Sequence, residues 1–168
     1  MRNPFLIDVG EELRHPGVRR TLARTAPLPG VALSTTRVPD DADVSAELVV
    51  EAQGATIIVA GTVSAPWVGE CRRCLGPTEG EITAEVHEVF EQSPTEGETF
   101  PLVGEHVDLA PMLRETLALA LPLAPLCAED CAGPDPEDHP VRVPSDDDAG
   151  ARPADPRWAA LDELRFDA

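Results

Sequence analysis

The chain contains no lysine and no tyrosine, and aromatic residues make up only 4 % of its 168 positions. Its core must therefore consist mainly of Val, Leu, Ile and Ala, which the apolar content of 42 % can supply. All thirteen basic residues are arginine. Together with abundant Ala, Pro and Asp, this composition is typical of a GC-rich genome and needs no functional cause.

Long apolar runs are also lacking: no segment has the length of a membrane span or of the apolar part of a signal peptide. We therefore expect a cytoplasmic protein, in which paired cysteines favour metal binding over disulfides. The formal net charge is −18, so phosphate backbones should be repelled unless a local basic patch exists. We expect neither a membrane nor a small-molecule substrate as a partner.

Motifs of common enzyme classes are missing as well. There is no Gly-rich phosphate loop, no dinucleotide fingerprint and no G-x-S-x-G elbow. The histidines are scattered; His87 falls on the outward face of an expected strand, and His139 could serve as a spare ligand near the last cysteine. The many carboxylates show no pattern of a catalytic pair, so we expect a protein that is not an enzyme.

The four cysteines form two pairs, and they are the most informative feature that is present. Cys71 and Cys74 make a C-x-x-C turn, and Cys127 and Cys131 follow far downstream. Such a turn directs both sulfurs at one point, and two pairs can complete a tetrahedral zinc shell of four thiolates. Gly76 suits the positive φ that the exit of this turn often needs.

Two other interpretations of the cysteines stay open. A redox C-x-x-C usually begins a helix, but here a strand pattern precedes Cys71 and a turn follows it. Alternatively, all four are free thiols without a metal. We favour zinc, whose four-thiolate centre carries a charge of roughly −2 that Arg72 and Arg73, inside the turn, could stabilise.

Alternating apolar and polar residues predict a sheet around this turn. Strands are expected at residues 5–9, 44–51, 56–64 and 81–91. Gln53-Gly54 joins the second and third strands as a hairpin, and Gly61 is a candidate bulge. The cysteine turn would then lie at the tip between two strands, while residues 93–104 read as a loop.

The only dense basic cluster comprises Arg14, Arg19, Arg20 and Arg24, next to a turn-rich passage at residues 10–17. These arginines could contact RNA or an acidic partner. They could equally pair with carboxylates of the chain itself. The sequence favours neither alternative.

A helix is expected after Asp108, which can cap its N-terminus. Pro111 is harmless in the first turn, and Pro122 ends the helix. The apolar positions recur at helical spacing and form a core-facing stripe of Leu109, Met112, Leu113, Leu117, Ala120 and Leu121. If this stripe packs on the sheet, the helix brings Cys127 and Cys131 to Cys71 and Cys74.

These elements predict an α+β fold: an antiparallel β-sheet or partial barrel with one main packed helix and a disordered acidic segment near the C-terminus. Residues 1–132 would form the domain. Residues 133–154 are rich in Pro and Asp and are expected to be disordered. Residues 155–168 carry a short helical pattern with Trp158, which either folds back on the domain or docks on a partner.

Three motifs resemble the YceD family, whose members are described as large ribosomal RNA subunit accumulation proteins. They are residues 69–75 (Gly-Glu-Cys-Arg-Arg-Cys-Leu), the segment from Asp108 through residues 119–127 (Leu-Ala-Leu-Pro-Leu-Ala-Pro-Leu-Cys), and residues 155–161 (Asp-Pro-Arg-Trp-Ala-Ala-Leu). One departure concerns the second cysteine pair, which many relatives follow with Gly-Leu-Cys-x-x-Cys-Gly. Here Ala132-Gly133-Pro134 follows Cys131, so one metal site is favoured over two separate knuckles.

The resemblance implies a non-enzymatic role in the accumulation or maturation of large-subunit ribosomal RNA. Its partner would be that RNA, a pre-ribosomal particle or a basic ribosomal protein. The residues expected to make the contact are Arg72, Arg73, Arg14, Arg19, Arg20 and Arg24. An acidic chaperone for one basic protein is the alternative, and a thiol oxidoreductase is a weaker third hypothesis.

Overall fold

The computed structural model describes residues 3–139, which belong to two units. The first unit, Met1–Cys131, contains every helix and strand found in the described part of the chain. The second unit is described only from residue 132 to residue 139, where a turn joins His139 to Asp135. Most of the expected acidic linker, and the whole expected C-terminal helix at residues 155–168, lie outside the described residues.

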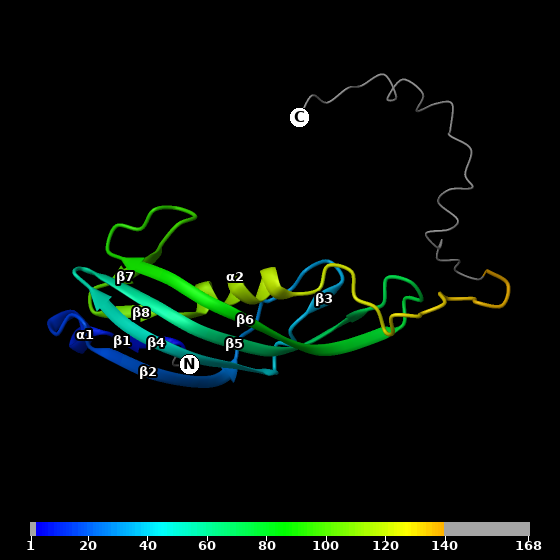
Figure 1. The fold of residues 1–168 in the computed structure, drawn as a ribbon, viewed down its shortest axis with the longest axis horizontal. Helices are drawn as coiled ribbons and strands as arrows, with labels where there is room; N and C mark the ends of the chain where they lie inside the picture. The colour runs from blue at the N-terminus through cyan, green and yellow to red at the C-terminus, as the bar shows by residue number, and fades with distance from the viewer. Residues whose placement is uncertain (1–2, 140–168) are drawn as a thin grey trace, which may run out of the picture. The chain divides into compact units, whose positions relative to one another are not determined.

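The first unit is built on a curled, eight-stranded half-barrel (Figure 1). Seven strands follow the order β1-β8-β7-β6-β5-β4-β2, and β3 pairs with β5 beside this path. Neighbours are antiparallel except for β6 and β7, which run parallel where they pair. The strands are β1 (Leu6–Asp8), β2 (Arg19–Pro27), β3 (Thr36–Arg37), β4 (Asp43–Gln53), β5 (Thr56–Glu70), β6 (Pro77–Glu91), β7 (Phe100–Val103) and β8 (His106–Asp108).

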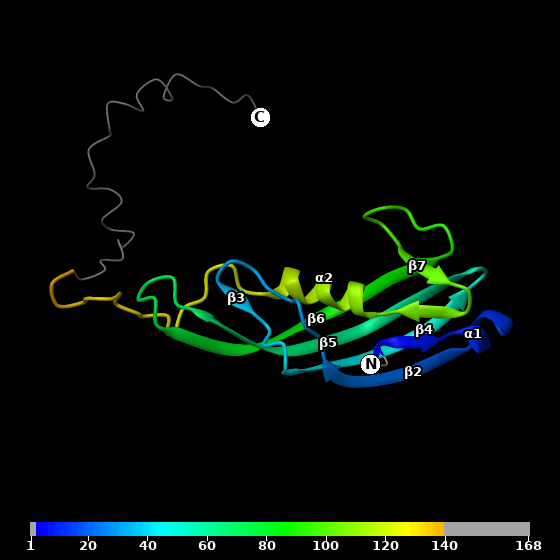
Figure 2. The same cartoon turned by 180° about the vertical axis from the view of Figure 1, so that it is seen from behind.

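One main helix, α2 (Ala110–Ala120), lies along the sheet (Figure 2). Its buried residues are Ala110, Met112, Leu113 and Leu117, which belong to the same core as the inward side chains of β4, β5 and β6. Its N-cap is Leu109 rather than the predicted Asp108, although Asp108 Oδ1 accepts a hydrogen bond from the Ala110 N–H at 3.0 Å. The predicted fold class is thus confirmed. No helix in the described part of the chain is long and apolar enough to cross a membrane.

Three elements near the predicted turn and loop segments differ from expectation. Residues 10–17 contain a short helix, α1 (Gly10–Arg14), and the loop expected at residues 93–104 contains β7. The strand β2 was not predicted, because Leu22 is its only buried residue and no apolar alternation marks it. An edge strand packs little of its surface, so its sequence carries a weak signal.

Gly61 does not form the expected bulge. It pairs with Leu48 of β4 and with Val86 of β6, and the register continues on both sides without an extra residue. Its φ is +152°, and a Cβ there would overlap the carbonyl oxygen of Glu47 and lie 2.9 Å from the Leu48 Cα. Glycine is therefore required for close approach of two strands rather than for an insertion.

The hairpin of β5 and β6 extends well beyond the predicted strands and positions the cysteine turn. Pairing continues to Glu70 opposite Pro77, so the turn lies at the tip of two long strands. Pro66, Gly69 and Gly80 interrupt the apolar pattern, which explains why the sequence predicts shorter strands. β3 pairs with Val68 and Gly69 and so supports the hairpin just below its tip.

Candidate metal centre

The first cysteine pair lies in a compact turn at the hairpin tip. The Cys71 N–H donates to the Gly76 carbonyl at 2.8 Å, and the Leu75 N–H donates to the Cys71 carbonyl at 2.9 Å. The positive φ is at Leu75, with a value of 59°, and not at Gly76 as predicted. A non-glycine residue rarely adopts this conformation, and here it leaves the Leu75 side chain 70 % exposed.

The segment after α2 holds the second pair against this tip through backbone groups. Thr36 Oγ1 donates to the Pro122 carbonyl at 3.1 Å, and the Arg72 N–H donates to the Pro125 carbonyl at 2.9 Å. These bonds connect the helix exit both to β3 and to the cysteine turn. The path of the chain toward Cys127 is therefore fixed on two sides.

The four sulfurs converge. All ligand atoms of Cys71, Cys74, Cys127 and Cys131 lie within 4.8 Å of one another. The Sγ atoms of Cys71 and Cys131 are 3.7 Å apart, as are those of Cys74 and Cys127. A tetrahedral site with Zn–S bonds of about 2.3 Å requires sulfurs about 3.8 Å apart. The residues present therefore fit a four-sulfur metal site.

The electrostatics of the four thiols also suit a cation. Backbone N–H groups, that of Cys74 first and that of Cys127 next, stabilise the thiolate and lower the pKa of Cys71 to about 6. Hydrogen bonding to the side chains of Cys131 and then Cys74 raises the pKa of Cys127 to about 12. One thiolate thus forms easily while its neighbour resists a further negative charge. A divalent cation removes this conflict.

Arg73 takes part in the centre, whereas Arg72 faces solvent. The Arg73 Nη1 donates to the carbonyls of Glu129 and Cys131, at 2.9 and 3.1 Å, and so fixes the loop between the second pair. Arg72 contributes its backbone N–H to the centre, and its residue surface is exposed. Of the two predicted contact residues, Arg72 is thus the one available to a partner.

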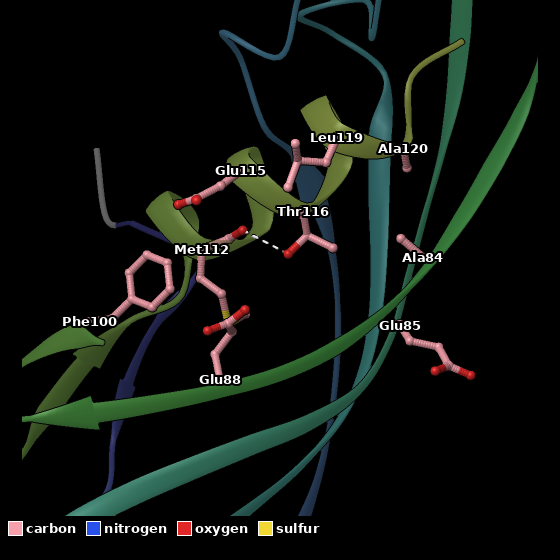
Figure 3. Close-up of a pocket in the computed structure, with 9 residues that line it drawn as sticks. All are labelled: Ala84, Glu85, Glu88, Phe100, Met112, Glu115, Thr116, Leu119 and Ala120. Atoms are coloured by element: carbon pink, nitrogen blue, oxygen red, sulfur yellow. Dashed lines mark hydrogen bonds between the residues drawn. The ribbon is translucent and has the colours of Figure 1, made fainter. Parts of the chain in front are cut away.

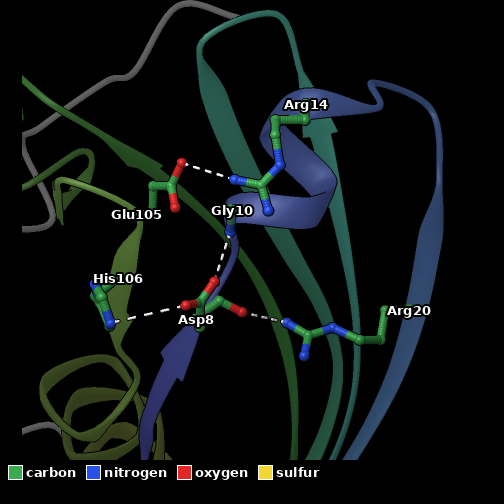
Figure 4. A network of polar contacts seen from close by, with 6 residues as sticks. All are labelled: Asp8, Gly10, Arg14, Arg20, Glu105 and His106. Atoms are coloured by element: carbon green, nitrogen blue, oxygen red, sulfur yellow. Dashed lines mark hydrogen bonds and ion pairs between the residues drawn. The ribbon is translucent and has the colours of Figure 1, made fainter.

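The other predicted arginines belong to α1 and β2. Arg19 and Arg20 lie opposite Glu51 and Val50 of β4, toward the end of the sheet away from the cysteine turn, whereas Arg24 lies opposite Ala46 near the middle of the sheet. Arg14 pairs with Glu105 at 3.0 Å, Arg19 with Glu51 at 2.6 Å, and Arg20 with the buried Glu12 at 2.5 Å. Figure 4 shows that Arg20 also donates to the backbone carbonyl of Asp8, which links β2 to β1 across the open side of the half-barrel.

These pairings favour the alternative in which the basic cluster binds the chain's own carboxylates. Arg24 differs, since its hydrogen bond goes to the adjacent Ala23 carbonyl at 2.9 Å. Arg19 and Arg20 lie in register with the end of the β5–β6 hairpin away from the cysteine turn, so they do not share a surface with Arg72 and Arg73. Among the described residues, the cluster that could hold a metal ion contains cysteines alone, and His87 is exposed on its strand.

The fold and the cysteine cluster define a mostly β protein in which a long hairpin and the exit of one helix share a four-sulfur centre. The chain belongs to the YceD family, described as large ribosomal RNA subunit accumulation protein YceD, whose model matches residues 59–165. The match contains all four cysteines, β6 and α2. The family suggested by the three sequence motifs is therefore confirmed.

The relatives are mycobacterial. The chain is 33 % identical over 172 residues to the uncharacterized protein Rv2926c of Mycobacterium tuberculosis, with 96 % of this chain and 82 % of the relative covered. It is 30 % identical over 139 residues to the uncharacterized protein ML1660 of Mycobacterium leprae, with 78 % and 64 % covered. No solved structure matches the chain.

Proposed function

We propose that this chain is a non-enzymatic factor that supports the accumulation and maturation of large-subunit ribosomal RNA. The observation that carries the proposal is membership of a family described by that role. The chemistry of the site agrees with a role that is not catalytic. Four cysteine sulfurs would complete the tetrahedral shell of a zinc ion, whereas a catalytic zinc keeps a position open for water or substrate.

Zinc is the metal that suits this centre best. Four thiolates in a tetrahedral arrangement select zinc over cations that prefer oxygen ligands. The metal would join two segments that are far apart in the chain, the hairpin tip and the exit of α2. It would therefore act as a structural staple that keeps the tip in one conformation.

The stapled tip is the part of the molecule that we propose contacts the pre-ribosomal particle in the cytoplasm. Arg72, which directly precedes Arg73, and Leu75, which directly follows Cys74, are both exposed at this tip. A guanidinium beside an exposed apolar side chain suits contact with either RNA or a ribosomal protein. The arginines near α1 are less suitable, because three of them are paired with carboxylates.

Depletion of the protein in its own host tests the proposal. We expect a lower ratio of mature large-subunit to small-subunit RNA, and restoration by the wild-type gene. Arg72→Ala should restore the ratio only in part, whereas Arg24→Ala, which removes an arginine of β2 away from the tip, should restore it fully. An unchanged ratio after depletion, together with a normal profile of ribosomal subunits, would refute the role.

The acidic chaperone is retained as a second candidate because the net charge of −18 favours basic protein clients. The composition of complexes purified from cells under native conditions distinguishes the two. Pre-ribosomal particles with large-subunit RNA support the assembly factor. A single basic protein without RNA supports the chaperone.

A further inference from the structure

A groove runs between α2 and β6, on the face of the sheet that carries the helix (Figure 3). Its volume is about 340 Å³. Apolar groups line much of it, including Ala84 of β6, Phe100 of β7, and Met112 and Leu119 of α2. Leu119 is 82 % exposed although it belongs to the helix that covers the core. The groove thus offers apolar surface that the described chain leaves uncovered.

The edge of β6 beside this groove is largely without a strand partner among the described residues. On one side β6 pairs with β5 from Pro77 to Phe90, but on the other it pairs with β7 only at Phe90 and Glu91. For residues 79–89, no second neighbouring strand is present in the described part of the chain. Unpaired N–H and C=O groups on a strand edge can accept an added strand from another polypeptide.

The charge around the groove indicates what kind of strand would fit. Glu88 and Glu115 line both the groove and an adjoining hollow, to which Glu98 also contributes. None of these three carboxylates forms an ion pair with a described residue. The ion pairs in the described part of the chain are made by Arg14, Arg19, Arg20 and His106 with other carboxylates. A basic segment would supply the missing partners and would be steered toward this edge.

We propose that the groove binds an extended, basic segment of a partner protein, which adds as a strand to the free edge of β6. Apolar side chains on one face of that segment would cover Leu119 and the exposed part of Phe100. Arginine or lysine side chains would reach Glu88, Glu98 and Glu115. Strand addition gives affinity through backbone hydrogen bonds, and the side-chain pockets give specificity.

Two other occupants fit the charge less well. RNA would bring phosphates next to carboxylates, which costs free energy. A second copy of this chain, itself with a net charge of −18, would place the same carboxylates against each other. The inference goes beyond the proposed function, because it holds whether or not the partner belongs to the large subunit.

The test uses the full chain and a fluorescent octapeptide of alternating arginine and valine, blocked at both ends. At about 3.3 Å per residue, eight residues span about 26 Å and fit within the free part of the strand edge at residues 79–89. Fluorescence anisotropy compares this peptide with one of the same composition in blocks, four arginines followed by four valines. We expect the alternating peptide to bind at least about tenfold more tightly, and N-methylation of alternate backbone nitrogens to abolish that preference.

Substitutions at exposed positions test the groove, and each is compared with a matched substitution outside it. The double variant Glu98→Arg/Glu115→Arg should weaken binding at least about tenfold, whereas Asp43→Arg/Glu47→Arg, with the same change of charge on the exposed side of β4, should stay within about twofold. Leu119→Ser should weaken binding by about threefold or more, and Leu123→Ser, at a similarly exposed leucine outside the groove, should not.

Equal affinity for the alternating and block peptides, or equal loss in both double variants, would show non-specific attraction to an acidic protein and would overturn the proposal. Tighter binding of single-stranded RNA than of the peptide, competing at the groove, would also overturn it. So would self-association of the chain through β6, measured by sedimentation and abolished by Leu119→Ser.

Discussion

Replacing Cys127 with serine distinguishes a metal centre from four free thiols. Cys127 is the exposed member of the four, whereas Cys71 is buried. Without a metal, exchanging sulfur for oxygen at an exposed site should change the free energy of unfolding by no more than about 0.5 kcal/mol. With a metal, the same exchange removes one of four ligands and opens the link between the hairpin tip and the exit of α2.

The size of the effect follows from the loop that the metal closes. Cys74 and Cys127 are 53 residues apart, and their sulfurs are 3.7 Å apart in the folded protein. A cross-link over a loop of that length stabilises the folded state by about 4 kcal/mol, mainly by restricting the unfolded chain. For a domain of this size we therefore expect Cys127→Ser to lower Tm by about 10–15 °C.

The measurement is thermal unfolding with and without a zinc chelator, combined with zinc quantitation on protein never exposed to chelator. Chelator should lower Tm of the wild type by a similar amount and should have little further effect on Cys127→Ser. The control is Ala128→Ser, which introduces the same hydroxyl one residue away and should leave both Tm and zinc content unchanged. A wild type with well below one zinc per chain, or a Tm for Cys127→Ser equal to that of the control, would refute the centre.

Three further predictions concern the scaffold and are measured by urea denaturation. Gly61→Ala should cost about 3 kcal/mol, because its Cβ would overlap the β4 backbone; a neutral effect would contradict the close approach. Arg20→Ala should cost about 2–3 kcal/mol by leaving the buried Glu12 carboxylate unpaired, and Arg24→Ala should be neutral; equal effects would contradict the pairing. Leu117→Ala, at 0 % exposure, should cost about 2–5 kcal/mol; a cost below about 1 kcal/mol would show that α2 is not packed.

The fold was predictable where one face of an element is buried. In β4 the alternation of Val44, Ala46, Leu48 and Val50 corresponds to residues that are at most 1 % exposed. The stripe of α2 was equally clear, because its buried positions recur at helical spacing. Strand β2 was missed since it buries only Leu22, and the two short strands β7 and β8 contain too few residues for any period to show.

The sequence predicted which four cysteines form the candidate centre, but not the backbone conformation and the hydrogen bonds that hold them. The helix exit and the hairpin tip were expected to meet, because a helix packed on the sheet leaves little freedom for the chain before Cys127. The positive φ at Leu75 carried no sequence signal, since a glycine follows directly and is the better candidate. The bonds from Arg73 to the carbonyls of Glu129 and Cys131 depend on tertiary structure, so spacing along the chain could not reveal them.

The charges at the hairpin tip bear on which component of a pre-ribosomal particle the protein would contact. Arg72 and Arg73 add two positive charges, but a zinc centre with four thiolates carries roughly −2 and cancels them. Glu129 and Asp130, between the second pair of cysteines, make the surroundings more negative still. Binding of nucleic acid depends on neutralising several phosphates, which one exposed guanidinium in an acidic protein cannot do. If the tip makes the proposed contact, through Arg72 and Leu75, these charges therefore favour a protein of the particle over bare RNA as the direct contact.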